Sequence, residues 1–521
     1  MGLFSKSQVE SINAIAQKSK AVQAPVPTKK VSSINDELIQ SSKAVEEYFK
    51  DSPAILIETK QQLHDYVTAA IEHKYVGIDT ETTGLDRQND YIVGASLYYP
   101  DGVECYIPMK HRIPIFEDFY KGQLSYQDVA EELNRLVDGK ARLIFANANF
   151  DLYMIWKDLK VDLCPAFYYD VILAWRCLKE DELHNGLKEL YNKYVLKGEG
   201  DPKRFSDFFS PALFPYCKPE IAKLYAANDA KITYDLFAWQ LPFTNKNSKA
   251  CQKNNLQSIA DLIWNVEFPL VSLIQDIERT GMHIDQDNAK VLQEKYHALY
   301  DREMKNLQEM VQQVIDNANV ISSKQPPFTS GANFNPKSTL HVKYLLYTLL
   351  DLPKPNGKES TGKEVLDELN LPITSKIVEV RSLATNINTF VDKLPQIVGV
   401  DEKIHADFKQ AGAATGRMSS ASPNLQNIPS KLDDIRHMFR ATPAKFKETV
   451  ESDNLEFELD KTSYVQLSDN SMKCSNNLQV GDTLLIEDDS NFTHALCEVA
   501  EVLNLSGEKI QVRLQLCPEY C

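Results

Sequence analysis

Two carboxylates lie two positions apart, at Asp79 and Glu81, where a short apolar run ends. Side chains alternate between faces along a strand, so both carboxylates point the same way. Two carboxylates on one side of a strand end can hold a divalent cation, because Mg²⁺ and Mn²⁺ prefer hard oxygen ligands. On its own, however, so short a motif favours the simpler interpretation of a polar strand end before a turn at Gly84.

Two further segments carry acidic groups in a compatible arrangement. Asp151 follows a second apolar run at residues 143–145, and Tyr225 and Asp229 lie four residues apart in a helical pattern. Residues at i and i+4 share one face of a helix, so a hydroxyl and a carboxylate project together. Each segment alone would be unremarkable, but together they favour a site.

In order and spacing, the three segments resemble the motifs of the DEDD superfamily of 3′–5′ exonucleases, in its Tyr-bearing branch. The resemblance implies an α/β, RNase H-like exonuclease domain over residues 54–245. It also implies that Asp79, Glu81, Asp151 and Asp229 bind two divalent ions, Mg²⁺ or Mn²⁺. One ion lowers the pKa of the attacking water and the other neutralises the leaving oxygen. Tyr225, the fifth expected catalytic residue, would orient that water.

The same resemblance indicates candidate DNA contacts, and two assignments stay open. Thr80 and Leu85 are expected to contact the terminal nucleotide. Asn147 is either a supporting group that contacts DNA or a structural amide at a strand end. Asp170 is either a further metal ligand or a structural residue, and we favour the structural role.

Hydrophobic periodicity predicts the elements that would position these residues. The strands are expected at 55–57, 75–79, 91–99, 103–107 and 143–145, the third and fourth joined by the hairpin signal Pro100-Asp101-Gly102. The helices are expected at 63–73, 151–159, 186–195 and 219–239.

The sequence beyond the second exonuclease motif resembles the proofreading domain of family A DNA polymerases. Residues 170–174 and 186–190 look like the helices of that domain, and residues 334–338 and 360–366 look like parts of the family's thumb. Residues 255–400 are therefore expected to form a helical thumb-like region, with one helix ending at Gly281. The alternative is a plain helical interaction domain.

Residues 401–445 are expected to begin a palm, and Ile404 to Phe408 alternates like a strand. The stretch from Thr415 to Pro429 resembles the primer–template signature of family A polymerases almost residue for residue. Its polar side chains can donate to minor-groove acceptors and phosphates, which report duplex geometry more than sequence. The implied DNA contacts are Arg417, Asn424, Gln426 and Asn427.

The resemblance then stops. Between Ala441 and Cys521 we find neither the Asp-Tyr-Ser-Gln motif, nor the Lys-bearing nucleotide-binding helix, nor the His-Asp-Glu segment of the family. We therefore expect that nucleotide addition needs a missing palm and fingers, from a second polypeptide if the chain is not simply truncated.

Residues 446–521 read as an acidic, β-rich insertion or tail, with roughly 15 acids against 4 bases from residue 448 onward. β-prone runs are expected at 455–459, 464–467, 483–486 and 510–516. A faint similarity of residues 477–484 to the Hint fold of inteins is disfavoured, because no Cys lies between Ala441 and Lys473.

Composition narrows the class of protein. The net charge of −16 argues against nonspecific nucleic-acid affinity over the whole surface. Nine scattered cysteines without a C-x-x-C pair indicate a reducing compartment, and no apolar run approaches a membrane span. We expect a cytoplasmic protein without a membrane partner, located in the bacterial host if phage-encoded. Residues 1–53 are expected to form a flexible arm with one short helix near 34–49 and no 5′ nuclease domain.

The favoured function is that of a DNA replication polypeptide of family A, phage-like, with a proofreading 3′–5′ exonuclease. Its expected partners are a primer–template duplex and a single-stranded 3′ end. The alternatives are a stand-alone 3′–5′ exonuclease and a non-polymerising DNA-binding subunit. The signature from Thr415 to Pro429 argues against the free nuclease, which has no need of a primer–template grip.

Overall fold

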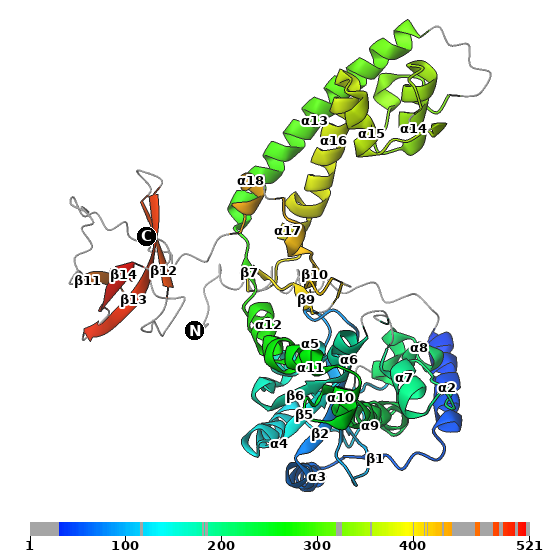
Figure 1. The fold of residues 1–521 in the computed structure, drawn as a ribbon, viewed down its shortest axis with the longest axis vertical. Helices are drawn as coiled ribbons and strands as arrows, with labels where there is room; N and C mark the ends of the chain where they lie inside the picture. Colours follow the sequence, from blue (N-terminus) through cyan, green and yellow to red (C-terminus); the bar gives the residue numbers. More distant parts are fainter. Residues whose placement is uncertain are drawn as a thin grey trace, which may run out of the picture. The chain divides into compact units, whose positions relative to one another are not determined.

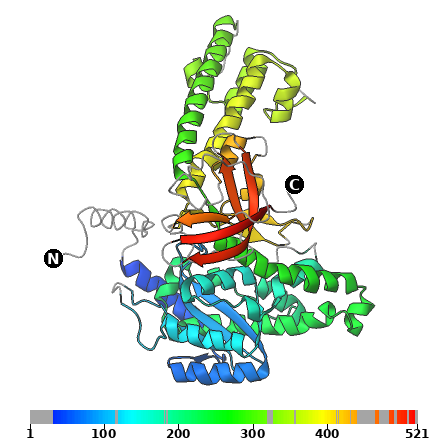
Figure 2. The same ribbon diagram turned by 90° about the vertical axis from the view of Figure 1, so that its left-hand side faces the viewer.

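The chain divides into two compact units (Figures 1 and 2). The structure is a computed structural model that describes residues 31–114, 118–179, 182, 186–318, 326–354, 357–399, 401–410, 412–413, 415–429, 432–439, 464–468, 483–488, 493–505 and 509–516. The first unit comprises residues up to Thr280 together with Asp407–Ser422, and the second comprises Gly281–Ala406 and the chain from Pro423 onward.

A six-stranded mixed sheet forms the centre of the first unit, in the order β1-β4-β3-β2-β5-β6. β2 pairs in parallel with β5 and antiparallel with β3, which continues antiparallel to β4. The five strands expected from the sequence are therefore confirmed, including the hairpin, whereas β6 was not anticipated. The strands are β1 (Ile55–Leu56), β2 (Tyr75–Thr82), β3 (Ile92–Tyr98), β4 (Cys105–Pro108), β5 (Arg142–Phe145) and β6 (Phe167–Asp170).

Helices pack on this sheet through apolar side chains that are fully buried, such as Ile78, Leu143 and Ile144. The helix α3 begins with a capping box at Thr59, whose side chain accepts the Gln62 N–H. The helices of this part are α3 (Lys60–His73), α4 (Tyr126–Asp138), α5 (Ala148–Leu159), α6 (Val171–Leu178), α7 (Leu187–Leu190), α8 (Phe205–Phe208) and α9 (Pro219–Thr244).

The close approach of α9 to β2 depends on Gly77. A Cβ at Gly77 would lie 2.3 Å from the carbonyl oxygen of Ala230, a main-chain atom that cannot turn away. Glycine therefore lets the helix lie directly against the strand. This contact brings the residue before Ala230, Asp229, next to the strand that carries Asp79.

The expected N-terminal arm is ordered over its second part, where the short helix was anticipated. α2 (Val31–Tyr48) packs against α9 and buries Leu38 and Val45, which lie seven residues apart on one face. The structure thus places a helix in the expected arm, whose flexibility stays a prediction, and residues 1–30 lie outside the described part of the chain.

The first unit also includes helices that follow the exonuclease region and a hairpin from much later in the sequence. The helices are α10 (Lys249–Lys253), α11 (Gln257–Leu262) and α12 (Phe268–Thr280). The hairpin consists of β9 (Asp407–Lys409) and β10 (Ser419–Ala421), which pair antiparallel. The strand expected from Ile404 to Phe408 is in fact two short strands that belong to different units.

The second unit is mainly helical. Gly281 has φ +66, as the predicted helix end requires, and the chain continues into β7 (Met282–His283), paired with β8 (Lys403–Ile404). The long helix α13 (Gln286–Asn317) packs against α16 (Pro372–Asn386) (Figure 1). The remaining helices are α14 (Thr339–Tyr344), α15 (Lys363–Leu369), α17 (Lys393–Gln396) and α18 (Asp433–Arg436).

Four antiparallel strands lie in the C-terminal segment, in the order β11-β14-β13-β12. Three of them coincide with predicted β-prone runs, β13 was not predicted, and the run at 455–459 lies outside the described residues. The strands are β11 (Tyr464–Ser468), β12 (Thr483–Asp488), β13 (Thr493–Leu505) and β14 (Lys509–Leu516). Across the described parts of the chain, no helix is both long and apolar enough to cross a membrane.

Candidate active site

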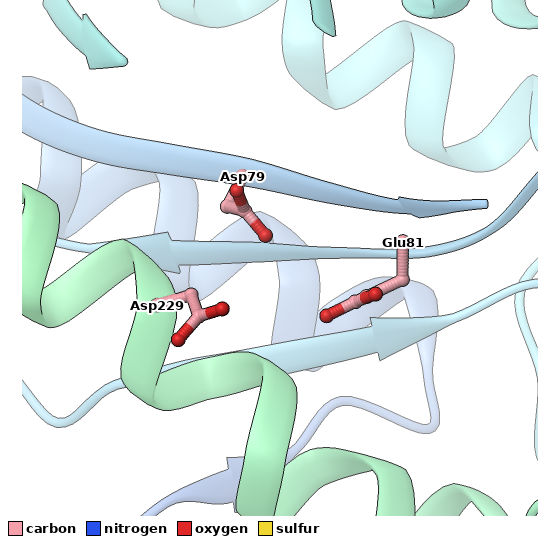
Figure 3. A group of neighbouring side chains, drawn as sticks. All are labelled: Asp79, Glu81 and Asp229. Carbon is pink, nitrogen blue, oxygen red and sulfur yellow. The ribbon is translucent and has the colours of Figure 1, made fainter. Parts of the chain in front are cut away.

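Three carboxylates converge between β2 and α9 (Figure 3). Oxygen atoms of Asp79, Glu81 and Asp229 all lie within 4.8 Å of one another. The alternation of β2 puts the first two on one face, and the close packing of α9 at Gly77 supplies the third. Within the described residues, this is the group of acidic side chains suited to holding a metal ion.

The electrostatics of the cluster are those of a cation site. Burial raises the pKa of Asp79 well above its usual value, and the charges of Asp151, Asp229 and Glu81 raise it further. Burial and the charge of Asp229 raise the pKa of Glu81 to about 8. The residues fit a divalent ion, because hard oxygen donors converge and a cation would relieve the repulsion that shifts these pKa values.

Asp151, the fourth expected ligand, lies beside this group and is turned toward β2. Its Oδ1 accepts hydrogen bonds from the Thr80 main-chain N–H at 3.0 Å and from the Thr80 hydroxyl at 2.5 Å. Burial raises its pKa to about 7, although both hydrogen bonds oppose the shift. Its role as a ligand stays a prediction.

Tyr225 lies one helical turn before Asp229 on α9, as the i, i+4 spacing predicted. Its pKa is raised first by burial and then by the charges of Asp229, Glu81 and Asp79, so the hydroxyl lies close to the carboxylates. The Tyr225 ring makes edge contacts with four aromatic side chains, the first of which follows α2: Phe49, Phe205, Phe208 and Phe209.

Lys188 is a site residue that the sequence analysis missed. Its Nζ lies 3.1 Å from Asp229 Oδ1, donates to the Tyr225 hydroxyl and stands 3.7 Å from the centre of the Tyr225 ring. The sequence analysis treated residues 186–190 only as a family-like helix. A lone lysine on a short helix gives no signal of its own, because only the packing of α7 against α9 brings it to the acidic group.

The other candidates near the cluster differ in their surroundings. Thr80 is buried and engaged with Asp151, whereas the Leu85 side chain is 84% exposed. Asn147 is exposed to solvent at the start of α5, and its backbone has the left-handed conformation, with φ 73. Asparagine tolerates this conformation well, which is a structural reason for an asparagine at this position. The expected DNA contact of Asn147 stays a prediction.

Asp170 has a structural role, as we favoured. Its carboxylate accepts hydrogen bonds from the main-chain N–H groups of Asn147, Ala148, Ile172 and Leu173. It thereby caps α6 and ties the start of α5 to the end of β6.

The four expected primer–template contacts are divided between the two units. Arg417 belongs to the first unit, and Asn424, Gln426 and Asn427 belong to the second. All four are exposed. Asn424 also has a local role, since its Oδ1 accepts the Gln426 main-chain N–H at 3.1 Å.

The acidic group lies within a region that is similar to known exonucleases. A family model described as 3′-5′ exonuclease matches residues 54–239, and a model described as DNA polymerase family A matches residues 301–473. The DNA polymerase I of Pseudomonas aeruginosa is 28% identical over 398 residues, which cover 71% of this chain and 38% of that protein. The DNA polymerase of Escherichia phage T5 is 26% identical over 400 residues, covering 71% and 42%.

A solved structure shares the fold. The POL domain of Pol1 from M. smegmatis, in complex with DNA primer-template and dNTP, has a TM-score of 0.51 at 18% identity. The match covers 72% of this chain and 56% of that one.

The two family matches define a polypeptide that joins a 3′–5′ exonuclease domain to polymerase sequence. The chain is similar to family A of the DNA polymerases over residues 301–473. It spans about two fifths of the length of these curated relatives. The polymerase match ends at residue 473, so it includes part of the segment that we separated at residue 445, and that boundary stays a prediction.

Proposed function

We propose that this chain removes nucleotides from the 3′ end of a DNA strand by metal-dependent hydrolysis, as the Tyr-branch DEDD proofreading exonuclease of a family A polymerase. The observation that carries this proposal is the convergence of Asp79, Glu81 and Asp229 beside Tyr225, inside the region that matches the exonuclease model. Two bound Mg²⁺ or Mn²⁺ ions would supply an activated water and a stabilised leaving oxygen.

Each residue of the site has its own proposed role in hydrolysis. Asp79, Glu81, Asp151 and Asp229 would hold the ions, and the Tyr225 hydroxyl would orient the attacking water. Lys188 supports Tyr225, because its ammonium group donates to the hydroxyl and lies against the ring. The same ammonium group offsets part of the negative charge at Asp229.

The proposed contacts with DNA involve mainly exposed side chains. Leu85 would pack on the terminal nucleotide, with Thr80 and Asn147 near it. Arg417, Asn424, Gln426 and Asn427 would contact the primer–template duplex, which their exposure supports. Nucleotide addition, in a cytoplasmic polymerase of phage type, would need the family's palm and fingers elements as well.

A digestion experiment tests the proposal. A single-stranded oligonucleotide labelled at its 5′ end is incubated with the protein and Mg²⁺, in parallel with the same strand carrying a phosphorothioate at its last 3′ linkage. We expect a ladder that shortens from the 3′ end, slowed by the phosphorothioate and abolished by EDTA. Digestion that persists in EDTA, or release of the labelled 5′ nucleotide first, would contradict the proposal.

A further inference from the structure

A buried ion pair joins segments of the first unit that are far apart in the sequence. Arg87 Nη1 lies 2.6 Å from Glu278 Oε2, and the two side chains are 13% and 1% exposed. Arg87 belongs to the loop that follows β2, whereas Glu278 lies on α12. Desolvation offsets much of the attraction within a buried ion pair, so its net contribution to stability is small. The ion pair is therefore more informative about which segments it holds together than about stability.

The same two side chains hold the β9–β10 hairpin. Arg87 Nε lies 3.3 Å from Asp407 Oδ1, and Glu278 Oε1 accepts the Phe408 main-chain N–H at 2.7 Å. Directly after β9, the buried Gln410 side chain donates to the Glu267 carbonyl oxygen at 2.8 Å. The hairpin that leads into the family A signature at Arg417 is thus attached to the exonuclease part of the unit.

The loop that carries Arg87, residues 83–90, is itself tightly braced. The Asp90 carboxylate accepts the Thr83 hydroxyl at 2.7 Å and the Asp86 main-chain N–H at 2.8 Å. Leu85 stands exposed in the middle of this loop. Because these hydrogen bonds close the loop on itself, they hold Leu85 within the loop without the help of Arg87.

Arg87 also lies against the segment of the second exonuclease motif. Its guanidinium stands 5.3 Å from the centre of the Tyr153 ring and 5.9 Å from that of Phe150, next to Asp151. Gln275 of α12 donates to the Asn149 carbonyl oxygen at 3.0 Å. Arg87 and α12 therefore both contact the segment that carries Asp151.

We propose that Arg87, held by Glu278 and Asp407, is a positioning residue that fixes the 83–90 loop relative to the β9–β10 hairpin, so that one primer–template engages both together. The inference rests on the proposed exonuclease function and adds to it a determinant of substrate class. A DNA molecule held at two sites gains affinity through effective concentration only if the spacing of the sites suits it. A single strand that contacts only the 83–90 loop gains no affinity from the spacing between the loop and the hairpin.

The test compares two substrates in three variants. Arg87→Met and Asp407→Asn remove the attachment from its two ends, and Arg279→Met is the matched control. Arg279 is 10% exposed, pairs with Asp162 at 2.9 Å and lies 5.3 Å from the Trp156 ring, so it also joins α12 to the exonuclease region. Among the described residues, none of its hydrogen bonds reaches the hairpin. The substrates are a single-stranded oligonucleotide and the same strand annealed as a primer with mismatched 3′ nucleotides.

We expect Arg87→Met and Asp407→Asn to raise the KM for the mismatched primer–template at least about fivefold, with kcat and all single-strand constants within twofold of the wild type. Arg279→Met should leave the ratio of the two KM values unchanged. The double variant Arg87→Met/Asp407→Asn should be no worse than the more affected single variant.

Equal KM ratios in wild type, Arg87→Met and Asp407→Asn would overturn the inference, and so would an equal change in Arg279→Met. Asp407 is a quarter exposed, so its variant tests the idea even if Arg87→Met folds poorly. A wild-type protein that hydrolyses neither substrate would instead contradict the proposed function itself.

Discussion

At the scale of single residues, the acidic group costs the metal-free protein stability. The carboxyl pKa values at Asp79, Glu81, Asp151 and Asp229 are all raised, chiefly by burial. Strand alternation and helix spacing were enough to predict which of these residues share a face. Those rules say nothing of a cation such as Lys188, whose place depends on how two helices pack.

The first prediction concerns pH. A carboxyl with a raised pKa holds its proton in the folded state after the unfolded chain has lost it, so stability falls as pH rises through the interval between the two values. For Glu81 that interval runs from the usual 4.5 to about 8. Urea unfolding in EDTA should show stability falling across this range, and Asp79→Asn should be more stable than the wild type at pH 8, because it removes a buried charge that neighbouring carboxylates repel. A variant less stable than the wild type there would contradict this picture.

The second prediction concerns Lys188. Replacing it with Met removes the donor to the Tyr225 hydroxyl and should lower the single-turnover hydrolysis rate roughly tenfold to a hundredfold. Lys193→Met is the control, because the half-exposed Lys193 instead pairs with Glu182 and lies 5.0 Å from the centre of the Tyr194 ring. A Lys188→Met enzyme as fast as the control would show that Tyr225 needs no such support.

At the scale of elements, the packing of α9 on β2 decides whether the site exists. The sequence predicted both elements from their periodicity, but not that they touch at Gly77. Periodicity also failed at β6, because the short run Phe167–Asp170 passes directly into α6 and looks like its beginning. Likewise, alternation from Ile404 to Phe408 could not reveal that the chain passes from one unit to the other within it.

The third prediction is that Gly77→Ala damages the site from a distance. The added methyl group meets the main chain at Ala230 and must push α9 outward, which separates Asp229 from Asp79. We expect a loss of about 1–3 kcal/mol in the free energy of unfolding and a higher Mg²⁺ concentration for half-maximal activity. A metal titration of activity and a thermal melt measure the two effects. Unchanged Mg²⁺ dependence would show that the helix position does not control the site.

At the scale of the whole molecule, the sequence predicted an exonuclease domain, a helical region and a β-rich segment. The family matches fall at residues 54–239 and 301–473, and the predicted domain boundaries stay predictions. The sequence could not predict which segments, far apart in the chain, pack against each other. The hairpin of residues 407–421, assigned from the sequence to a palm, packs with the exonuclease unit through Glu278 and Arg87. The contact between Arg87 and Asp407, more than 300 positions apart, leaves no local pattern for periodicity or propensity to reveal.

The most direct test of the central claim is the rate of nucleotide release from a 3′-labelled single strand in Mg²⁺ by the wild type and by Asp79→Ala/Glu81→Ala. The account predicts that the double variant releases nucleotide at least about a hundredfold more slowly, because the site loses two of its converging carboxylates. Its thermal melt without metal should be no lower than that of the wild type, because buried repulsion is removed. Undiminished release by a folded double variant would show that the hydrolysis occurs elsewhere, and the assignment of the site would be wrong.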